Sequence, residues 1–239
     1  EATSLLDKAI KNALVIEENF YNTEYIDDAY YILGTSSLIK NKITSAEYYF
    51  NRIVKEYNNS EYFTESLIMI GRINLKMNKL DGLEQVLDTI SNRNNLNNNE
   101  NYLFYLLLAD FSVFSQDYKM AKDNFLAALD FSDDKNKKIS IYYKLINLAQ
   151  LENDSLSIIH YIDEIQYLLE ENKISDELFE KWILNNEILG KYQVILRKLY
   201  EYLENESILK KKIDYSTKIA KTMLQMNDYL SAKDLLEML

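Results

Sequence analysis

Few side chains in this chain of 239 residues have the types and spacing that chemistry requires. His160 is the only histidine, and a metal site or a histidine-based acid–base pair would need further ligands or partners near it. Asp27 and Asp28 could begin a magnesium site, but one pair of neighbouring carboxylates does not complete the cage that the ion needs. There is no cysteine, which excludes disulfides, thiolate chemistry and cysteine-ligated metals. We therefore predict no enzyme, no metal site and no cofactor, and interpret His160 as a surface residue on the outer side of a helix.

Other conspicuous side chains have structural explanations. The acidic pairs at 27–28, 133–134 and 170–171 fall near predicted helix ends, where the helix dipole and solvent account for them. Trp182 falls at a core position of a predicted helix, which favours packing over a stacking platform for bases or sugars. The basic run 210–212 is short, and we interpret it as the solvated start of a helix rather than as a nucleic-acid patch.

The composition indicates an all-α chain. Hydrophobic residues make up 47% of it, proline is absent and only 4 glycines are present, so almost nothing interrupts helices. The formal net charge of -11 repels nucleic acid and anionic lipid surfaces at long range, which predicts no nucleic-acid partner and favours a basic or neutral one. No run of roughly 18 apolar residues exists, so we expect no direct membrane insertion in this segment. The chain begins with neither methionine nor a signal-peptide pattern, and we expect a piece of a longer protein whose signal or lipid anchor could have been removed.

The stretch 27–58 has the pattern of two antiparallel helices joined by a short turn. The first carries Tyr30, Leu33 and Gly34, and the second carries Ala46 and Phe50 at helical spacing, so each helix has one apolar stripe. Two helices alone bury too little surface to be stable, but the pattern recurs along the whole chain. The residues at the expected helix crossings are Ala9, Ala46, Leu83, Ala121, Ile158, Ile195 and Ala232, at separations of 37, 37, 38, 37, 37 and 37. This regularity predicts a one-dimensional stack of helix pairs.

We predict thirteen helices in a single solenoid over residues 1–239. Its expected divisions are a half repeat at 1–22 and repeats at about 23–59, 60–97, 98–135, 136–172, 173–209 and 210–239. Thr44 and Glu47 have the spacing of a capping box at the start of a second helix, and Ser175 is a predicted N-cap. The asparagine-rich segment 92–100 is predicted to be a linker, because asparagine side chains compete for backbone hydrogen bonds. The last repeat is predicted to bury Leu236 and Leu239.

These patterns resemble the tetratricopeptide repeat (TPR) superfamily over the whole chain. The first repeat matches best at Tyr30, Leu33, Gly34, Ala46 and Phe50, and the third at Tyr105, Leu108, Ala109, Ala121, Phe125 and Ala128. The family's proline at the repeat end is missing, and the period of 37 residues exceeds the usual ~34. The resemblance implies an α-solenoid of antiparallel helix pairs that winds into a right-handed superhelix.

Two narrower resemblances concern the setting of the protein. Residues 22–66 are similar to repeats of bacterial outer-membrane assembly lipoproteins and related envelope TPR proteins, in which aromatic-Asn-Asn-Ser-Glu-Tyr links successive units. This favours the bacterial periplasm or cell envelope over the cytoplasm, although the sequence leaves the compartment open. The later repeats are equally similar to the TPR sensor regions of bacterial signalling proteins.

In TPR arrays the first helix of each pair lines the concave surface, so the resemblance implies a ligand groove there. By repeat position, the candidate groove residues are Asp28, Tyr31, Glu65, Arg72, Asp110, Tyr143, Asn147, Glu177, Glu180 and Glu187. Acidic residues outnumber basic ones in this set, which suits a basic, partly apolar peptide or protein segment. The fifth position of the first helices holds Tyr31, Ile68, Leu106, Tyr143, Glu180 and Thr217, so we expect no basic clamp for a C-terminal carboxylate. The other interpretation of these carboxylates is a solvated helix face.

The sequence therefore predicts a non-enzymatic scaffold that binds a protein or peptide in an acidic, tyrosine-containing groove. The alternative is a sensory or regulatory TPR module of a bacterial multidomain signalling protein. An α-helical enzyme would instead require a closed cavity with clustered carboxylates. The identity of the partner and the oligomeric state do not follow from the sequence.

Overall fold

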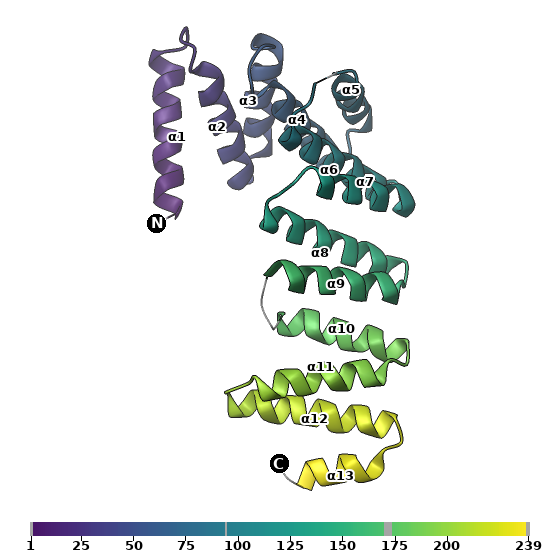
Figure 1. The fold of residues 1–239 in the computed structure, drawn as a ribbon. Coiled ribbons are helices and arrows are strands. Elements are labelled where there is room, and N and C mark those ends of the chain that lie inside the picture. Colours follow the sequence, from purple (N-terminus) through teal and green to yellow (C-terminus); the bar gives the residue numbers. More distant parts are fainter. Residues whose placement is uncertain (1, 94, 170–173, 238–239) are drawn as a thin grey trace. The chain divides into compact units, whose positions relative to one another are not determined.

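The computed structural model describes residues 2–93, 95–169 and 174–237, and in these ranges the chain forms thirteen α-helices and no strand (Figure 1). The helices are α1 (Ala2–Asn19), α2 (Ile26–Ile39), α3 (Ile43–Glu56), α4 (Phe63–Lys76), α5 (Leu80–Ser91), α6 (Asn98–Phe114), α7 (Tyr118–Asp130), α8 (Lys135–Leu151), α9 (Ser155–Leu169), α10 (Asp176–Ile188), α11 (Tyr192–Glu204), α12 (Leu209–Gln225) and α13 (Tyr229–Glu237). The predicted all-α class and the predicted number of helices are confirmed. The acidic pair 170–171 and Leu239 lie outside the described residues.

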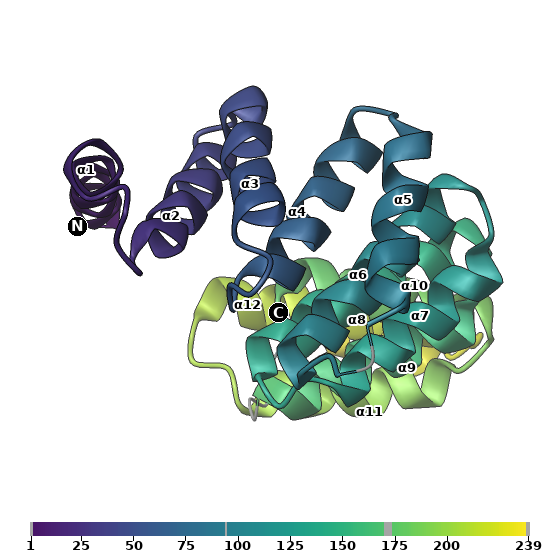
Figure 2. The same cartoon turned by 90° about the horizontal axis from the view of Figure 1, so that it is seen from above.

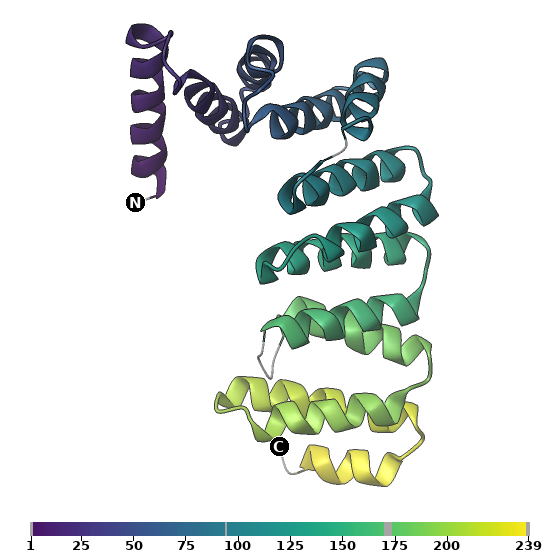
Figure 3. The same cartoon turned by 45° about the horizontal axis from the view of Figure 1, so that its top comes forward.

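The chain divides into two compact units, Glu1–Ser132 with α1 to α7 and Asp133–Leu239 with α8 to α13. Consecutive helices pair within each unit: α2 with α3, α4 with α5 and α6 with α7, then α8 with α9, α10 with α11 and α12 with α13. Figure 2 shows α1 to α4 following one another in the N-terminal unit, and Figure 3 shows α8 to α13 stacked helix on helix in the C-terminal unit. Each unit is an α-solenoid segment of antiparallel helix pairs. The predicted single solenoid, its repeat boundaries and its handedness stay predictions.

The two helices of every pair are joined by a turn with one residue in the left-handed region. These residues are Asn41 (φ 55°), Asn78 (φ 55°), Gln116 (φ 60°), Asn153 (φ 56°), Gly190 (φ 67°) and Asn227 (φ 62°). In the first pair, the Lys42 N–H donates to the Ser37 carbonyl at 2.8 Å and the Asn41 N–H donates to the Leu38 carbonyl at 2.9 Å. This is the Schellman arrangement, in which the two residues after a helix satisfy its last carbonyls. Glycine and asparagine adopt the left-handed conformation at the lowest cost, which explains their predominance at these turns.

The capping box predicted at Thr44 and Glu47 is wrong. The helix α3 begins at Ile43, and its N-cap is Lys42, whose side chain makes no capping hydrogen bond. Because the turn at Asn41 fixes where the second helix starts, Thr44 lies inside the first turn instead of at the cap.

The predicted start of α10 agrees with the structure, whereas α6 begins at Asn98, inside the predicted linker 92–100. The Ser175 hydroxyl accepts a hydrogen bond from the Leu178 N–H at 3.3 Å, so the predicted N-cap of α10 is confirmed. The asparagine-rich segment supplies a cap for α6, since the Asn97 side chain accepts from the Glu100 N–H at 3.0 Å and the Glu100 carboxylate accepts from the Asn97 N–H at 2.8 Å. This reciprocal pair is a capping box.

The predicted crossing residues lie at the centre of the helix pairs. Ala46, Leu83, Ala121, Ile158, Ile195 and Ala232 are at most 3% exposed, and Ala9 is half-buried. Gly34 shows why a crossing needs a small residue, because a Cβ there would lie 2.7 Å from Cε1 of the Phe50 ring. A Cβ at Gly71 would lie 2.7 Å from Cδ2 of Leu107. The missing side chain at Gly71 therefore lets α4 and α6 of neighbouring repeats approach equally closely. Small residues thus set the approach both within and between repeats.

Three predictions about burial are wrong. Leu236, predicted to lie in the core, is 47% exposed, because α13 packs mainly against α12 among the described helices. Ile68 and Leu106, predicted to face a groove, are 0% and 5% exposed. The helix α4 contacts α3, α5 and α6 at once, so Ile68 belongs to the hydrophobic cluster between them instead of facing solvent.

Candidate functional site

In the N-terminal unit, three predicted groove residues take part in a hydrogen-bonded ladder across the first helices. The Tyr62 hydroxyl donates to the Asp28 carboxylate at 2.8 Å. The rings of Tyr62 and Tyr31 stack with their centroids 4.4 Å apart. The Tyr31 hydroxyl and the Asn99 side-chain amide both donate to the Glu65 carboxylate. We call these five residues the inter-repeat ladder, which links α2 to the start of α4 and α4 to the start of α6.

The ladder follows the period of the repeat. Asp28 and Glu65 occupy equivalent positions, and each accepts a hydrogen bond from the residue 34 positions further along the chain, which is Tyr62 or Asn99. In both cases a carboxylate in the first turn of one repeat's first helix contacts the start of the first helix in the following repeat. Hydrogen bonds to charged groups are stronger than neutral ones, so the ladder fixes how neighbouring repeats are set against each other.

The two tyrosines of the ladder remain hydrogen-bond donors. Burial, together with the hydrogen bond to Glu65, raises the pKa of Tyr31 well above its usual value. The pKa of Tyr62 is raised chiefly by its hydrogen bond to Asp28, with burial as the second cause. Both phenols stay protonated at neutral pH, which suits a positioning role and not acid–base chemistry.

The two other groove candidates of this unit are not among the five residues of the ladder. Arg72 on α4 and Asp110 on α6 are both half-buried. Among the described residues, Arg72 has no hydrogen-bond or ion-pair partner. The sequence-predicted set is thus brought together at Asp28, Tyr31 and Glu65.

In the C-terminal unit, the predicted acidic residues are matched by lysines. Glu177 pairs with Lys181 on its own helix at 3.2 Å. Glu180 and Glu187 on α10 pair with Lys218 and Lys221 on α12, at 2.7 and 3.9 Å. These pairs lie at the surface, where each contributes only ~0.2–1 kcal/mol, but they neutralise much of the charge predicted for the groove. Tyr143 and Asn147 on α8 are exposed.

The helices α10 and α12 that carry these ion pairs also present apolar side chains to solvent. Leu184 is 55% exposed, Ile188 is 66% exposed and Leu224 is 44% exposed. All three lie toward the C-terminal ends of their helices. We call them the apolar strip of the C-terminal unit. Large apolar side chains that stay exposed among charged ones are common at interaction surfaces.

Sequence reasoning missed a polar contact made by the buried ring of Trp182. The indole N–H donates to the Asp163 carboxylate at 3.0 Å, and the Lys198 ammonium lies 4.4 Å from the centroid of the indole ring. Lys198 also donates to the Gln166 side chain at 2.6 Å, and burial lowers its pKa. Trp182 is 3% exposed, so its predicted role in packing is confirmed. The signal that could have revealed the contact is the recurrence of polar residues about one period apart on α9 and α11.

His160 is exposed, as predicted. In the described ranges, no group of three or more histidine, aspartate or glutamate side chains is placed to hold a metal ion. None of the described helices has the length and apolar character needed to cross a bilayer.

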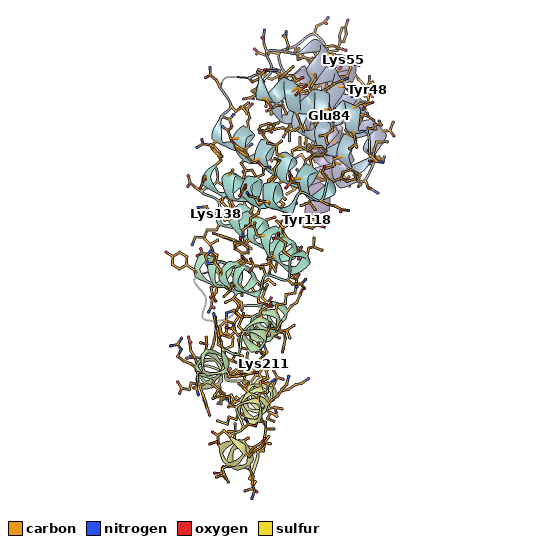
Figure 4. The ribbon with its side chains drawn as sticks, turned by 90° about the vertical axis from the view of Figure 1, so that its right-hand side faces the viewer. Tyr48, Lys55, Glu84, Tyr118, Lys138 and Lys211 are labelled. Carbon is orange, nitrogen blue, oxygen red and sulfur yellow. The ribbon has the colours of Figure 1, made fainter. Side chains whose placement is uncertain are left out.

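On the second helices of the N-terminal unit, Tyr48 and Lys55 on α3 and Glu84 on α5 are exposed, and Figure 4 labels them.

Comparison with known proteins defines the class of fold. No family model matches the chain, and no curated protein matches it. Nine chains of solved structures do match. One of them belongs to the crystal structure of the APC/C hetero-tetramer Cut9-Hcn1, with a TM-score of 0.53 and 14% sequence identity, and the match covers 98% of this chain and 47% of that one. The chain thus spans about half the length of that protein, and its fold is a TPR-like α-solenoid.

Proposed function

We propose that this chain is a non-enzymatic scaffold that binds a segment of another protein on the exposed faces of its first helices. The apolar strip of Leu184, Ile188 and Leu224 carries this proposal, because three large side chains there remain in contact with water. The structural neighbour takes part in a hetero-tetramer by its own description, which is in keeping with a fold used for assembly.

The partner that fits this face is partly apolar, with charged groups at its margins. The strip would bury its leucine and isoleucine side chains against an apolar stretch, while Glu187 and Lys221 would form part of a polar rim. The predicted basic character of the partner requires the carboxylates of Glu177 and Glu180 to exchange their lysine partners for groups on the ligand. In the N-terminal unit, the surface that we propose to contact the partner is formed by Arg72 and the edge of the inter-repeat ladder.

A site-specific cross-linking experiment tests the apolar strip. A photoreactive amino acid at position 184 or 188 is expected to cross-link to a partner protein, whereas the same group at position 156 is not. Leu156 is the matched control, since it is 60% exposed but lies on the second helix α9. Equal cross-linking at positions 184 and 156 would place the partner elsewhere.

A charge-reversal experiment tests the acidic component separately. Replacing Glu177, Glu180 and Glu187 with lysine is expected to reduce recovery of a basic partner. Unchanged recovery would refute the acidic groove and leave the apolar strip as the contact.

The bacterial cell envelope and the alternative role in signalling stay predictions from the sequence. The sequence of the whole protein separates them. A lipid-attachment cysteine upstream supports an envelope scaffold, and an effector domain downstream supports a signalling module.

A further inference from the structure

A small hollow lies in the N-terminal unit, between α1, α2 and α3 where α2 turns into α3; Figure 2 shows these three helices in succession. Its volume is about 170 Å³. The apolar part of its wall is formed by Ile10, Leu14, Leu33 and Tyr49. The polar part is formed by three serines and two lysines, Ser36, Ser37, Ser45, Lys40 and Lys42. No carboxylate lines this hollow, although the protein as a whole carries a formal net charge of -11.

The N-terminus of α3 opens at this hollow. This helix has 14 residues, and its N-cap Lys42 offers no side-chain hydrogen bond. The amide groups of residues 43–45 accordingly have no hydrogen-bond partner in the described part of the chain. Unsatisfied amides and the positive end of the helix dipole favour an anion at such a position.

Ser36 provides a second and independent indication of a ligand. It lines the hollow and is only 4% exposed. Its hydroxyl has no hydrogen-bond partner among the described residues, and the hydroxyl oxygen keeps some access to solvent. Because this hydroxyl has no protein partner in the described ranges, it can donate a hydrogen bond to an acceptor atom bound in the hollow.

The two lysines supply the charge. Lys42 has no ion-pair partner in the described ranges. Lys40 contacts the Asp7 carboxylate at 2.9 Å, but both side chains are well exposed, at 39% and 60%. An exposed pair of this kind is weak, so a doubly charged anion in the hollow can compete for Lys40.

We propose that this hollow binds a phosphomonoester. The hydroxyls, the free amides of α3 and the two lysines offer enough donors for the three terminal oxygens of a phosphoryl group. The apolar wall at Leu14 and Tyr49 would contact the carbon chain of the ester, which distinguishes this ligand from inorganic phosphate. In a scaffold, and on the function proposed above, such a group is the side chain of a phosphorylated threonine or serine of the bound protein.

The test titrates the whole chain with small probes and needs no partner, so its result is independent of the cross-linking experiment on the apolar strip. N-Acetyl-O-phosphothreonine amide is expected to bind saturably, at least ten-fold more tightly than inorganic phosphate. In ¹H–¹⁵N correlation spectra it should shift the amide signals of residues 43–45. N-Acetylthreonine amide is the probe without the phosphoryl group and should not bind.

Substitutions assign the binding to the hollow. Ser36→Ala and Lys42→Gln should each weaken binding of the phosphothreonine probe about ten-fold. Lys191→Gln is the matched control, since Lys191 is the exposed N-cap of α11 at the equivalent turn of another repeat. Ser45→Glu, at an exposed position, places a carboxylate in the site and should abolish binding even if Ser36→Ala disturbs the fold. The proposal is overturned by absence of saturable binding, by equal affinity for inorganic phosphate, or by binding that Lys42→Gln and Ser45→Glu leave unchanged.

Discussion

Substitution of Gly34 by alanine tests whether the helix crossing within a pair requires a missing side chain. Alanine has the higher helix propensity, and this alone would stabilise the protein by about 1 kcal/mol. The new Cβ, however, would lie 2.7, 2.9 and 3.0 Å from three atoms of the Phe50 ring. Phe50 is 0% exposed and belongs to the packed cluster, so its ring has little freedom to move. Overpacking of this kind costs roughly 1–3 kcal/mol, and with a contact this short we expect a net loss of about 1–2 kcal/mol.

The assay is urea unfolding of the whole chain, followed by the circular dichroism of its helices. The matched test is a double-mutant cycle with Phe50→Leu, a smaller side chain that leaves room for the added methyl group. Because Gly34 and Phe50 are in contact, we expect a favourable coupling of at least roughly 0.5 kcal/mol between the two substitutions. A Gly34→Ala variant as stable as the native chain, or additive effects of the two changes, would refute the steric explanation of the crossing.

Three further predictions concern the turns, the inter-repeat ladder and the buried indole. Gln116→Gly should stabilise the chain by ~0.5–1 kcal/mol and Gly190→Gln should destabilise it by a similar amount, because both positions require a positive φ. The expected readout is a pair of equal and opposite shifts of the urea midpoint. A loss of stability in Gln116→Gly would contradict this explanation. The raised pKa of Tyr31 contributes stability that is fully present below the ordinary tyrosine pKa of 10.0 and is lost as the pH rises toward the higher pKa of the folded state. The native chain should therefore lose more unfolding free energy above about pH 10 than Tyr31→Phe does, and parallel pH profiles would argue against the ladder bond. Trp182→Phe should cost ~1–3 kcal/mol, because it removes part of a ring that is 3% exposed together with the hydrogen bond from the indole N–H to the solvent-exposed carboxylate of Asp163. An unchanged urea midpoint would contradict this.

The helix pairs could be predicted from the sequence because their signal is apolar and periodic. Ala46, Ala121 and Ala232 lie 75 and 111 residues apart, which are two and three periods of the repeat. A crossing between two helices needs a small or aliphatic residue at each such point. The left-handed turn residues recur just as regularly, but they are asparagine, glutamine or glycine. A search for apolar positions does not detect such a mixed set, which is why the capping box predicted at Thr44 differs from the observed start of α3.

The candidate site was less predictable, since it depends on which faces of neighbouring helices meet. Periodicity marks Glu180 as a residue outside the core, but its pairing with Lys218 depends on how α10 and α12 are rotated against each other. Ile68 has the repeat position of a groove residue and is nevertheless buried, because α4 also packs on α6. The hollow beside α3 joins residues of three helices whose contacts no single repeat contains.

The inter-repeat ladder has a consequence for how an array of this kind can change in length. Asp28 and Glu65 are equivalent acceptors, and Tyr62 and Asn99 are equivalent donors. Deleting one full period between them would place the Asn99 amide opposite Asp28, which is again a donor facing an acceptor. We expect such a shortened chain to keep its repeats in register, so the same bonds that hold neighbours together also permit whole units to be removed or duplicated.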